Sequence, residues 1–525
     1  MIMRRLMEVY LVGGAVRDKL LGKAPEDKDY VVVGSSPEDM EAKGFLPVGR
    51  DFTVFLHPDS KDEYALARKE SSTGNGYNDF EFDTSCSVTL AEDLFRRDLT
   101  MNAIAYDEGT ETLIDPYDGH KDIANKKIRH VSPHFSEDPL RVLRVCRFMS
   151  RYHHLGFTVA DETLSIMKSM VNEGMLDALT PERIAKEMLR ALTETSPQAF
   201  FETLDRVGGL DVVFPELAAL KGKTQPAKHH PEIDTFIHQM MVLEQARKLT
   251  DDVDVMVAAL CHDFGKGLTP QELLPHHHGH EKSGVPLVKN FGLRLKLPKR
   301  MVSLAALTSE YHTHIHRAKE LTAPSFMLLL ERFDAFRSGE EQFKKFLIAA
   351  EADAKGRLGF EDRNYDQREL ALLALEAAKE AHWDKKMLLA VPPEFRKDFI
   401  YKLRLERVKK RLHHFHAPEK YRQYREQYDN FLNLTTPEKL NVLCRDKGDQ
   451  HGNYVAQALA ISSLSEEDRA SILKLCSKLQ EVRKYWLSNL TGNNAIDSSK
   501  KRALYKGVIE SFEKKMDNIH SELER

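Results

Sequence analysis

The chain has 525 residues, 42% of them hydrophobic, and a formal net charge of −4. A chain of that length is too long to fold around a single hydrophobic core, which predicts a globular protein of several domains. No apolar run approaches the roughly 20 residues of a membrane-spanning helix, so a membrane protein is not expected. The N-terminus lacks a signal-peptide pattern, and five scattered cysteines without metal-ligand spacing predict a reducing, cytoplasmic location.

Up to about residue 136 the sequence predicts strands joined by turns and short helices. The strand-like runs are VYLVGG, DYVVVG, DEYALAR and ETLIDPYDG. Residues 70–80 (ESSTGNGYNDF) are rich in Gly, Ser and Asn and predict a mobile loop.

Helical patterns begin after residue 136 and continue to the end of the chain. Residues 137–156 have helical periodicity with Pro139 in the first turn, and Thr180 followed by Pro181 marks another helix start. The loop 222–234 (GKTQPAKHHPEID) leads into a histidine-rich helical segment. The predicted fold class is α+β, with a small mixed-sheet head followed by helices. The predicted domains are a head at 1–136, a helical neck at 137–225, a histidine-rich region at 226–340, a helical tail at 341–434 and a helical extension of unknown role at 435–525.

Asp27 and Asp29 stand at the mouth of a predicted strand, shortly after a Gly13–Gly14 turn. Residues two apart in a strand project to the same face, so the two carboxylates form a pair of hard oxygen ligands suited to Mg²⁺. Glycine lets the backbone approach a triphosphate closely, and Arg17, about one turn into the next helix, can reach its phosphates. The alternative is a surface turn followed by an exposed acidic strand start.

EDPLRVLRVCRF (residues 137–148) offers a way to choose a base. Asp138 and Arg141 are three apart, which predicts neighbours on one helix face. A carboxylate accepts from the amino group of cytosine or adenine, and a guanidinium donates to cytosine N3 and O2 or adenine N1. Uracil and guanine present the wrong groups, so the pair would select C and A without a nucleic-acid template. Arg144 and Arg147 continue the spacing toward the phosphates; the alternative is a solvated basic helix face.

A second constellation consists of histidines and aspartates in the order H…HD…H…H…D. Its candidates are His238, His262, Asp263, His280, His312 and Asp353. Imidazole and carboxylate ligands suit a transition metal that activates water against a phosphate ester. Each histidine alone is as well explained by packing, and neighbouring histidines are rival ligands: His276, His277, His278, His314 and His316.

In this order, LVGGAVRD…DKD, RRDLTMNA (96–103), EDPLRVLRVCRF and the HD segment resemble the bacterial tRNA nucleotidyltransferases, or CCA-adding enzymes. These form class II of the DNA polymerase beta superfamily, and the gammaproteobacterial type with an HD domain is the most similar. The resemblance runs from about Val9 to about Phe360. It implies addition of CCA to tRNA from CTP and ATP, with Mg²⁺ on catalytic Asp27 and Asp29 and Glu63 as the candidate third carboxylate. The implied nucleotide-binding residues are Gly14, Arg17, Arg97, Asp98 (at the ribose hydroxyls), Asp138, Arg141, Arg144 and Arg147.

The same resemblance implies that the HD region is a metal-dependent phosphatase, 2′-nucleotidase and 2′,3′-cyclic phosphodiesterase, with nickel as a candidate metal. It also implies an acidic residue after His312, where this chain has Thr313. Residues 70–80 occupy the place of the family's flexible loop, which is linked to the switch from C to A addition. Expected partners are tRNA, CTP and ATP, with no membrane, and the protein is expected to be a monomer or homodimer.

Three alternatives stay open. A bacterial poly(A) polymerase shares the head motifs, although the strand DYVVVGSSPEDM and the HD segment count against it. The chain could instead be an RNA-end metallohydrolase with a degenerate head, or a non-catalytic RNA-binding protein. The basic segment 402–416 (KLRLERVKKRLHHFH) fits tRNA phosphate contacts or a solvated amphipathic helix.

Overall fold

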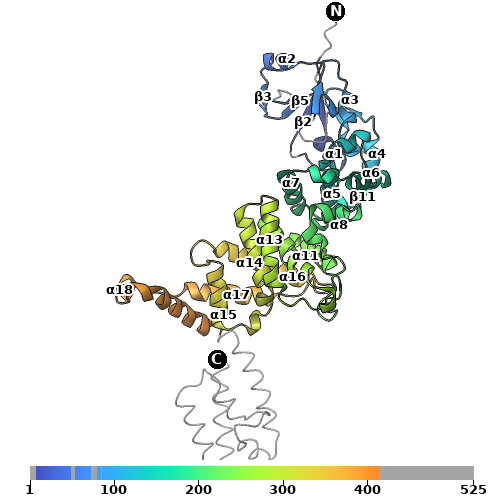
Figure 1. Ribbon diagram of the computed structural model, residues 1–525. Helices are drawn as coiled ribbons and strands as arrows, with labels where there is room; N and C mark the ends of the chain where they lie inside the picture. Colours follow the sequence, from blue (N-terminus) through green and yellow to red (C-terminus); the bar gives the residue numbers. More distant parts are fainter. Residues whose placement is uncertain (1–6, 26, 49–53, 73–79, 84, 413–525) are drawn as a thin grey trace, which may run out of the picture. The chain divides into compact units, whose positions relative to one another are not determined.

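The computed structural model describes residues 7–25, 27–48, 54–72, 80–83 and 85–412 (Figure 1). The chain divides into two units after Leu405, and nearly all of the second lies outside these ranges. The predicted tail beyond residue 412 and the extension at 435–525 therefore fall outside the described residues. No helix in the described ranges combines the length and apolar character of a membrane span.

The head is built on a seven-stranded mixed sheet, which confirms the predicted α+β class. The strand order is β3 (Leu46–Val48), β4 (Val54–Leu56), β5 (Glu63–Leu66), β2 (Asp29–Val33), β1 (Glu8–Val12), β8 (Ala105–Asp107) and β9 (Thr112–Ile114). Only β2 and β5 are parallel, and their register sets Asp29 beside Glu63. β3, β4 and β8 were not among the predicted strands, since runs of three residues carry little periodicity.

Successive side chains of β2 point to opposite faces of the sheet, so they pack in two separate cores. Val31 and Val33 pack with Leu94 of α3 (Leu90–Phe95), whereas Val32 packs with Met40 of α2 (Pro37–Ala42). Because side chains two apart share a face, Asp29 lies on the α3 face at the start of the strand. The Asp29 carboxylate at the start of β2 therefore lies on the same face of the sheet as α3.

The segment predicted as a mobile loop begins and ends in strands instead. β6 (Lys69–Ser72) pairs antiparallel with β7 (Phe80–Asp83), with Glu70 opposite Phe82. Cross-strand backbone hydrogen bonds satisfy these residues whatever their composition, so the loop prediction was wrong at residues 70–72 and 80. Residues 73–79 lie outside the described residues.

The other elements are mainly helical. After α1 (Gly14–Leu20) and α4 (Gly119–Ala124), the neck contains α5 (Leu140–Tyr152), α6 (Asp161–Asn172), α7 (Pro181–Leu192), α8 (Gln198–Arg206), α9 (Leu210–Val213) and α10 (Pro215–Ala218). The histidine-rich region contains α11 (Thr235–Leu249), α12 (Val253–Cys261), α13 (His280–Arg294), α14 (Lys299–His316) and α15 (Ala323–Arg332), and α16 (Glu340–Lys355) follows it. α17 (Asp366–Lys379), α18 (Lys385–Leu389) and a helix at 396–412 follow. The short 3₁₀ helices are η1 (Thr100–Asn102), η2 (Pro133–Glu137), η3 (His153–Leu155), η4 (Met175–Ala178), η5 (Phe264–Leu268), η6 (Gln271–Leu273), η7 (Ala318–Glu320) and η8 (Pro393–Phe395), and β10 (Lys127–Ile128) pairs with β11 (Thr158–Val159).

Asp138 corrects the prediction made for the base-selecting helix. The residue has an extended backbone (φ −118°, ψ 107°) and precedes α5 rather than lying in it. Its successor is Pro139, and the residue before a proline is pushed out of the helical region by the pyrrolidine ring. Asp138 and Arg141 therefore do not share a helix face, and any cooperation between them depends on tertiary contacts.

Candidate functional site

The glycine turn brings an arginine of the RRD motif to the acidic end of β2. Gly13 has a φ of 68°, and a Cβ at this residue would lie 3.2 Å from Nη1 of Arg97. Arg97 is held there by two N–H groups that donate to Asp93, at 3.3 and 3.2 Å. A side chain at position 13 would strain the backbone and displace this guanidinium.

Asp29 has the electrostatics of a cation site. Burial raises the pKa of its carboxyl, Arg97 offsets part of that rise, and the Asp27 carboxylate adds to it. Glu63, its partner in the parallel register, brings a third carboxylate to the same edge on the same face. The hard oxygen ligands of these residues fit Mg²⁺, since a divalent cation would relieve the repulsion between the carboxylates.

Arg17 is almost entirely buried, at 5% exposure. Its guanidinium donates to Asp18 at 3.0 Å and to the side chain of Asn102 at 2.7 Å, and it lies over the rings of Phe148 and Tyr152 on α5. These contacts orient the arginine between the glycine turn and the neck. Its predicted role at the phosphates stays a prediction.

Asp98 and Arg144 form a second ion pair of the site. Nε and Nη2 of Arg144 each lie 2.7 Å from Asp98, and Asn102 donates to the same carboxylate at 3.1 Å. Burial alone would raise the pKa of Asp98, but Arg144, Asn102 and Arg141 together hold it well below its usual range. Asp98 is therefore ionised and acts only as an acceptor.

The predicted base-selecting side chains are each fixed by a partner remote in sequence. Arg183 of α7 donates from Nη2 to both oxygens of Asp138, at 3.1 and 2.9 Å. Arg141 donates to the backbone oxygens of His134 and Arg96, at 2.8 and 2.7 Å. A guanidinium has five N–H groups, so Arg141 keeps donors beyond these two bonds.

These contacts form one continuous series from Arg97 to α5. Arg97 donates to the backbone oxygen of Asn102, whose side chain contacts both Arg17 and Asp98. Asp98 then pairs with Arg144 on α5. Arg147, farther along α5, is buried and pairs with Glu187 of α7 at 2.6 Å. The structure thus links the predicted nucleotide-binding residues of the head with those of the neck.

The second constellation gathers on five helices that pack together, α11, α12, α13, α14 and α16 (Figure 1). All six predicted residues meet there. Nε2 of His262 lies 3.2 Å from Asp263, Nε2 of His280 and of His312 lie 3.3 and 3.5 Å from the other oxygen of Asp263, and Nε2 of His238 lies 3.1 Å from Asp353.

The four histidines present the same ring nitrogen to the centre. Each Nδ1 faces a backbone oxygen: that of Gly356 for His238, of Ala259 for His262, of His277 for His280, and of Thr308 and Ser309 for His312. A carbonyl only accepts, so each ring donates from Nδ1, which leaves Nε2 as the nitrogen that would bind a metal ion. Four Nε2 lone pairs beside two carboxylates are a donor set for a transition metal.

Buried polar atoms at the centre support this assignment. Nε2 of His262 and both carboxylate oxygens of Asp263 are buried without a well-formed hydrogen bond to any described residue. Lys266 is the nearest cation, with Nζ 2.6 Å from Asp263. Such orphaned atoms are costly in a protein core unless a ligand such as a metal ion satisfies them.

Ionisation at the cluster follows from its charge distribution. Burial opposes ionisation of Asp263 and Asp353, yet neighbouring histidines hold both pKa values well below their usual range, and Lys266 adds to this effect at Asp263. Burial alone would lower the pKa of His262, but the two aspartates raise it; for His312 burial prevails and its pKa is lowered. The carboxylates are thus ionised, as metal ligation requires.

Of the rival histidines, His316 joins the cluster: its Nε2 lies 2.6 Å from Asp353 and its Nδ1 lies 2.9 Å from the Tyr365 hydroxyl. His277 instead contacts Thr269 and the backbone of Thr224, and His314 is exposed. Thr313, where an acid was expected, donates to Glu281 at 2.9 Å.

Sequence reasoning missed four residues that support the two sites: Arg183, His230, Glu232 and Lys266. The signals were present but weak. Arg183 and Glu187 are spaced one helical turn apart in TPERIAKE, Lys266 follows the HD pair, and HHPEID stands immediately before α11.

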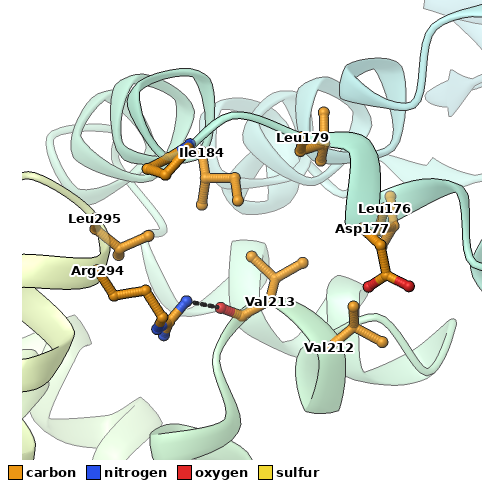
Figure 2. A pocket seen from close by; sticks show the side chains of 9 residues that line it. Leu176, Asp177, Leu179, Ile184, Val212, Val213, Arg294 and Leu295 are labelled. Carbon is orange, nitrogen blue, oxygen red and sulfur yellow. Dashed lines mark hydrogen bonds between the residues drawn. The ribbon is translucent and has the colours of Figure 1, made fainter. Parts of the chain in front are cut away.

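A pocket between the neck and α13 contains neither set of chemical groups (Figure 2). Its lining is mainly aliphatic, and its one arginine, Arg294, donates to the backbone of Val213 and to Glu216, at 3.0 and 2.7 Å. The two side-chain clusters described above, rather than this pocket, carry the chemistry.

Three protein-family models match separate parts of the chain. Residues 9–129 match the poly A polymerase head domain, residues 156–221 match the probable RNA- and SrmB-binding site of polymerase A, and residues 235–355 match the HD domain.

Curated relatives share about half of the aligned residues with this chain. The multifunctional CCA protein of Haemophilus influenzae strain PittGG is 50% identical over 380 residues, covering 71% of this chain and 91% of its own length. That of Pseudomonas fluorescens strain Pf-5 is 51% identical over 419 residues, covering 78% of this chain and 100% of its own. Among solved structures, the CCA-adding enzyme of Bacillus stearothermophilus in complex with CTP has a TM-score of 0.52 at 25% identity, covering 76% of this chain and 89% of that one.

Proposed function

Because this chain belongs to the multifunctional CCA proteins, the gammaproteobacterial type of CCA-adding enzyme with an HD domain, we propose that it adds C, C and A to the 3′ end of tRNA from CTP and ATP. The observation that carries the proposal is the series of hydrogen bonds from Arg97, whose charge acts on Asp29, through Asn102 and Asp98 to Arg144 on α5. It joins a cation site to side chains able to read a base.

In the proposed reaction the terminal RNA hydroxyl attacks the α-phosphate of the nucleotide. One P–O bond forms, the bond to pyrophosphate breaks, and pyrophosphate leaves. Mg²⁺ held by Asp27 and Asp29 would supply charge neutralisation at the attacking and leaving oxygens. Arg97 stands beside Asp29, where its positive charge would orient the phosphates, and ionised Asp98 is an acceptor for ribose hydroxyls.

Base choice is proposed to rest on Asp138 and Arg141 as two separately anchored groups. Arg183 and the Leu140 N–H fix the carboxylate, while two backbone oxygens fix the guanidinium. Groups locked in this way cannot rotate to suit uracil or guanine, which would leave a buried donor or acceptor unpaired. Rigid anchoring is therefore the proposed source of selectivity in place of a template strand.

The direct test is to incubate the protein with Mg²⁺ and a tRNA transcript that ends at the discriminator base. CTP and ATP are offered singly and together, and the products are sequenced. CTP alone should give two added residues, and both nucleotides should give CCA. Long A tails without C would instead identify a poly(A) polymerase, and binding without any addition would leave a non-catalytic RNA-binding protein.

Replacing Glu63 by glutamine is expected to lower the rate of addition roughly 10- to 100-fold. The loss of a third carboxylate beside Asp29 weakens the hold on Mg²⁺ but leaves the main pair, so the Mg²⁺ concentration at half-maximal rate should rise. Initial rates across a Mg²⁺ titration measure both effects. Glu41→Gln, an exposed carboxylate on α2, is the matched control. An unchanged Mg²⁺ dependence would remove Glu63 from the site.

Arg183→Ala is expected to relax base choice without abolishing the reaction. Freeing Asp138 from its arginine should cost about 1–3 kcal/mol of discrimination, or roughly 10- to 100-fold in the preference for CTP over UTP. Competition assays with both nucleotides measure the ratio directly. Arg190→Ala, an exposed arginine on the same helix, should retain full selectivity. Equal losses for all four nucleotides would show that Arg183 only stabilises the fold.

A second activity is proposed for the HD cluster: metal-dependent hydrolysis of phosphate esters at RNA ends, including 2′,3′-cyclic phosphates. The residues fit a transition metal, as the shared tautomer and the orphaned atoms of His262 and Asp263 indicate. Such a metal, nickel being one candidate, would supply an activated water. Lys266, beside Asp263, offers the charge to hold a phosphate. Release of 2′- or 3′-nucleotide from a 2′,3′-cyclic nucleotide in the presence of Ni²⁺ tests this, and a chelator should abolish it.

A further inference from the structure

Glu232 lies behind His238, on the side of the ring away from the cluster centre. It belongs to the loop between α10 and α11, and its side chain is 2% exposed. One carboxylate oxygen lies 3.0 Å from Nδ1 of His238 and 2.9 Å from Nδ1 of His230. The other accepts from the N–H of Leu358, at 3.3 Å. A buried carboxylate thus contacts two imidazoles and the loop that follows α16.

The two ring nitrogens of His238 face different surroundings. Nε2 points to the cluster, 3.1 Å from Asp353 and 3.9 Å from Asp263. Nδ1 faces the oxygen of Gly356 at 3.1 Å in addition to Glu232. Both of these groups accept, so Nδ1 carries a proton, and Nε2 is the nitrogen that would bind a metal ion.

This arrangement sets His238 apart from the other three cluster histidines. Within the described residues, His262, His280 and His312 make their Nδ1 hydrogen bonds to backbone oxygens. The Glu281 carboxylate lies 3.6 Å from Nδ1 of His280, whereas Glu232 lies at hydrogen-bond distance, 3.0 Å, from Nδ1 of His238. A carboxylate behind a ligating imidazole fixes its orientation and makes the facing nitrogen a stronger donor.

We propose that Glu232 is a positioning residue that holds His238 in the Nε2-ligating tautomer and ties it to the loop after Asp353. The inference deepens the proposed HD function, on which it rests, and assigns a role to the loop motif HHPEID. Because Gly356 accepts from His238 and Leu358 donates to Glu232, the carboxylate also keeps His238 and Asp353 at a fixed spacing. Outer partners of this kind typically change metal affinity 10- to 100-fold.

The alternative is that the same atoms bind a second metal ion. Ligand atoms of His230, Glu232 and His238 all lie within 4.8 Å of one another, close enough for one ion. The hydrogen-bonded arrangement is favoured because Nδ1 of His238 also donates to the Gly356 oxygen. A proton on Nδ1 leaves no lone pair there for a metal ion. The number of metal ions per chain separates the two arrangements.

The test uses the full-length, metal-free protein titrated with Ni²⁺ by calorimetry. Wild type should bind one ion at the cluster, and Glu232→Gln should bind it about 10- to 100-fold more weakly, since an amide can donate to Nδ1 and favour the wrong tautomer. Glu232→Asp keeps the charge but shortens the side chain by one methylene. Its affinity for Ni²⁺ should lie between those of wild type and Glu232→Gln. Glu272→Gln, an exposed glutamate of the same region, should match wild type. CCA addition by every variant checks that the head is folded.

Histidine ¹⁵N spectra of the metal-free protein give a readout that a purely structural role would not move. His238 should be protonated at Nδ1 in wild type and lose that preference in Glu232→Gln. Wild-type affinity and an unchanged tautomer in Glu232→Gln would overturn the proposal, as would two ions per chain of which Glu232→Gln loses one, or no Ni²⁺ bound by wild type. Tight binding without hydrolysis would overturn the proposed HD activity and leave the role of Glu232 standing.

Discussion

Asp29→Asn is expected to abolish the addition of both C and A, with a loss in rate of about a thousandfold or more. Asparagine keeps the size of the side chain but removes the charge that holds Mg²⁺. Loss of this charge stabilisation is worth several kcal/mol in the transition state, and each 1.36 kcal/mol is a factor of ten. Asp27→Ala should have the same consequence. Single-turnover addition of CMP to a tRNA lacking CCA measures the effect without interference from product release.

Two comparisons make this result specific. Asp39→Asn changes an exposed carboxylate on α2, beyond the other end of the same strand, and should add CCA normally. Hydrolysis of a 2′,3′-cyclic nucleotide by Asp29→Asn should equal that of wild type, because the HD cluster has its own ligands. If Asp29→Asn and Asp27→Ala both retained addition, the acidic end of β2 would not be the catalytic site.

His262→Ala is expected to have the opposite pattern: hydrolysis and tight Ni²⁺ binding are lost, while CCA addition continues. His262 is 1% exposed and its Nε2 has no hydrogen bond within the described residues, so its lone pair is available to the metal. Removing one imidazole from the donor set should weaken Ni²⁺ binding by at least 100-fold, roughly 3 kcal/mol or more. Calorimetry and the cyclic-nucleotide assay measure the two losses.

His314→Ala provides the matched control, because this histidine of α14 is exposed. It should bind Ni²⁺ and hydrolyse the cyclic nucleotide as wild type does. The pair Asp29→Asn and His262→Ala also separates the alternatives for the whole chain. A metallohydrolase with a degenerate head would show no addition in wild type, and Asp29→Asn would then change nothing.

Proximity along the chain explains why some structural features were predictable and others were not. The helix that carries His238 starts after Asp234, as predicted, because Asp234 caps it through the N–H groups of Phe236 and Ile237. The extended backbone of Asp138 was also encoded locally, in the proline that follows it, and the prediction of a shared helix face overlooked that signal. The pairing of β6 with β7 was hidden because it depends on backbone groups rather than on composition.

By itself, the sequence determined which chemical groups exist and in what order: two aspartates before a strand, an arginine-rich helix after a proline, and a histidine–aspartate series on helices. Local periodicity and capping are sufficient for that, because they act over a few residues. Only the tertiary structure decided which groups meet, such as Glu63 beside Asp29, Arg183 against Asp138, and Glu232 behind His238. Those contacts depend on strand register and helix packing, which are set by burial across the whole fold and leave no periodic signal in the chain.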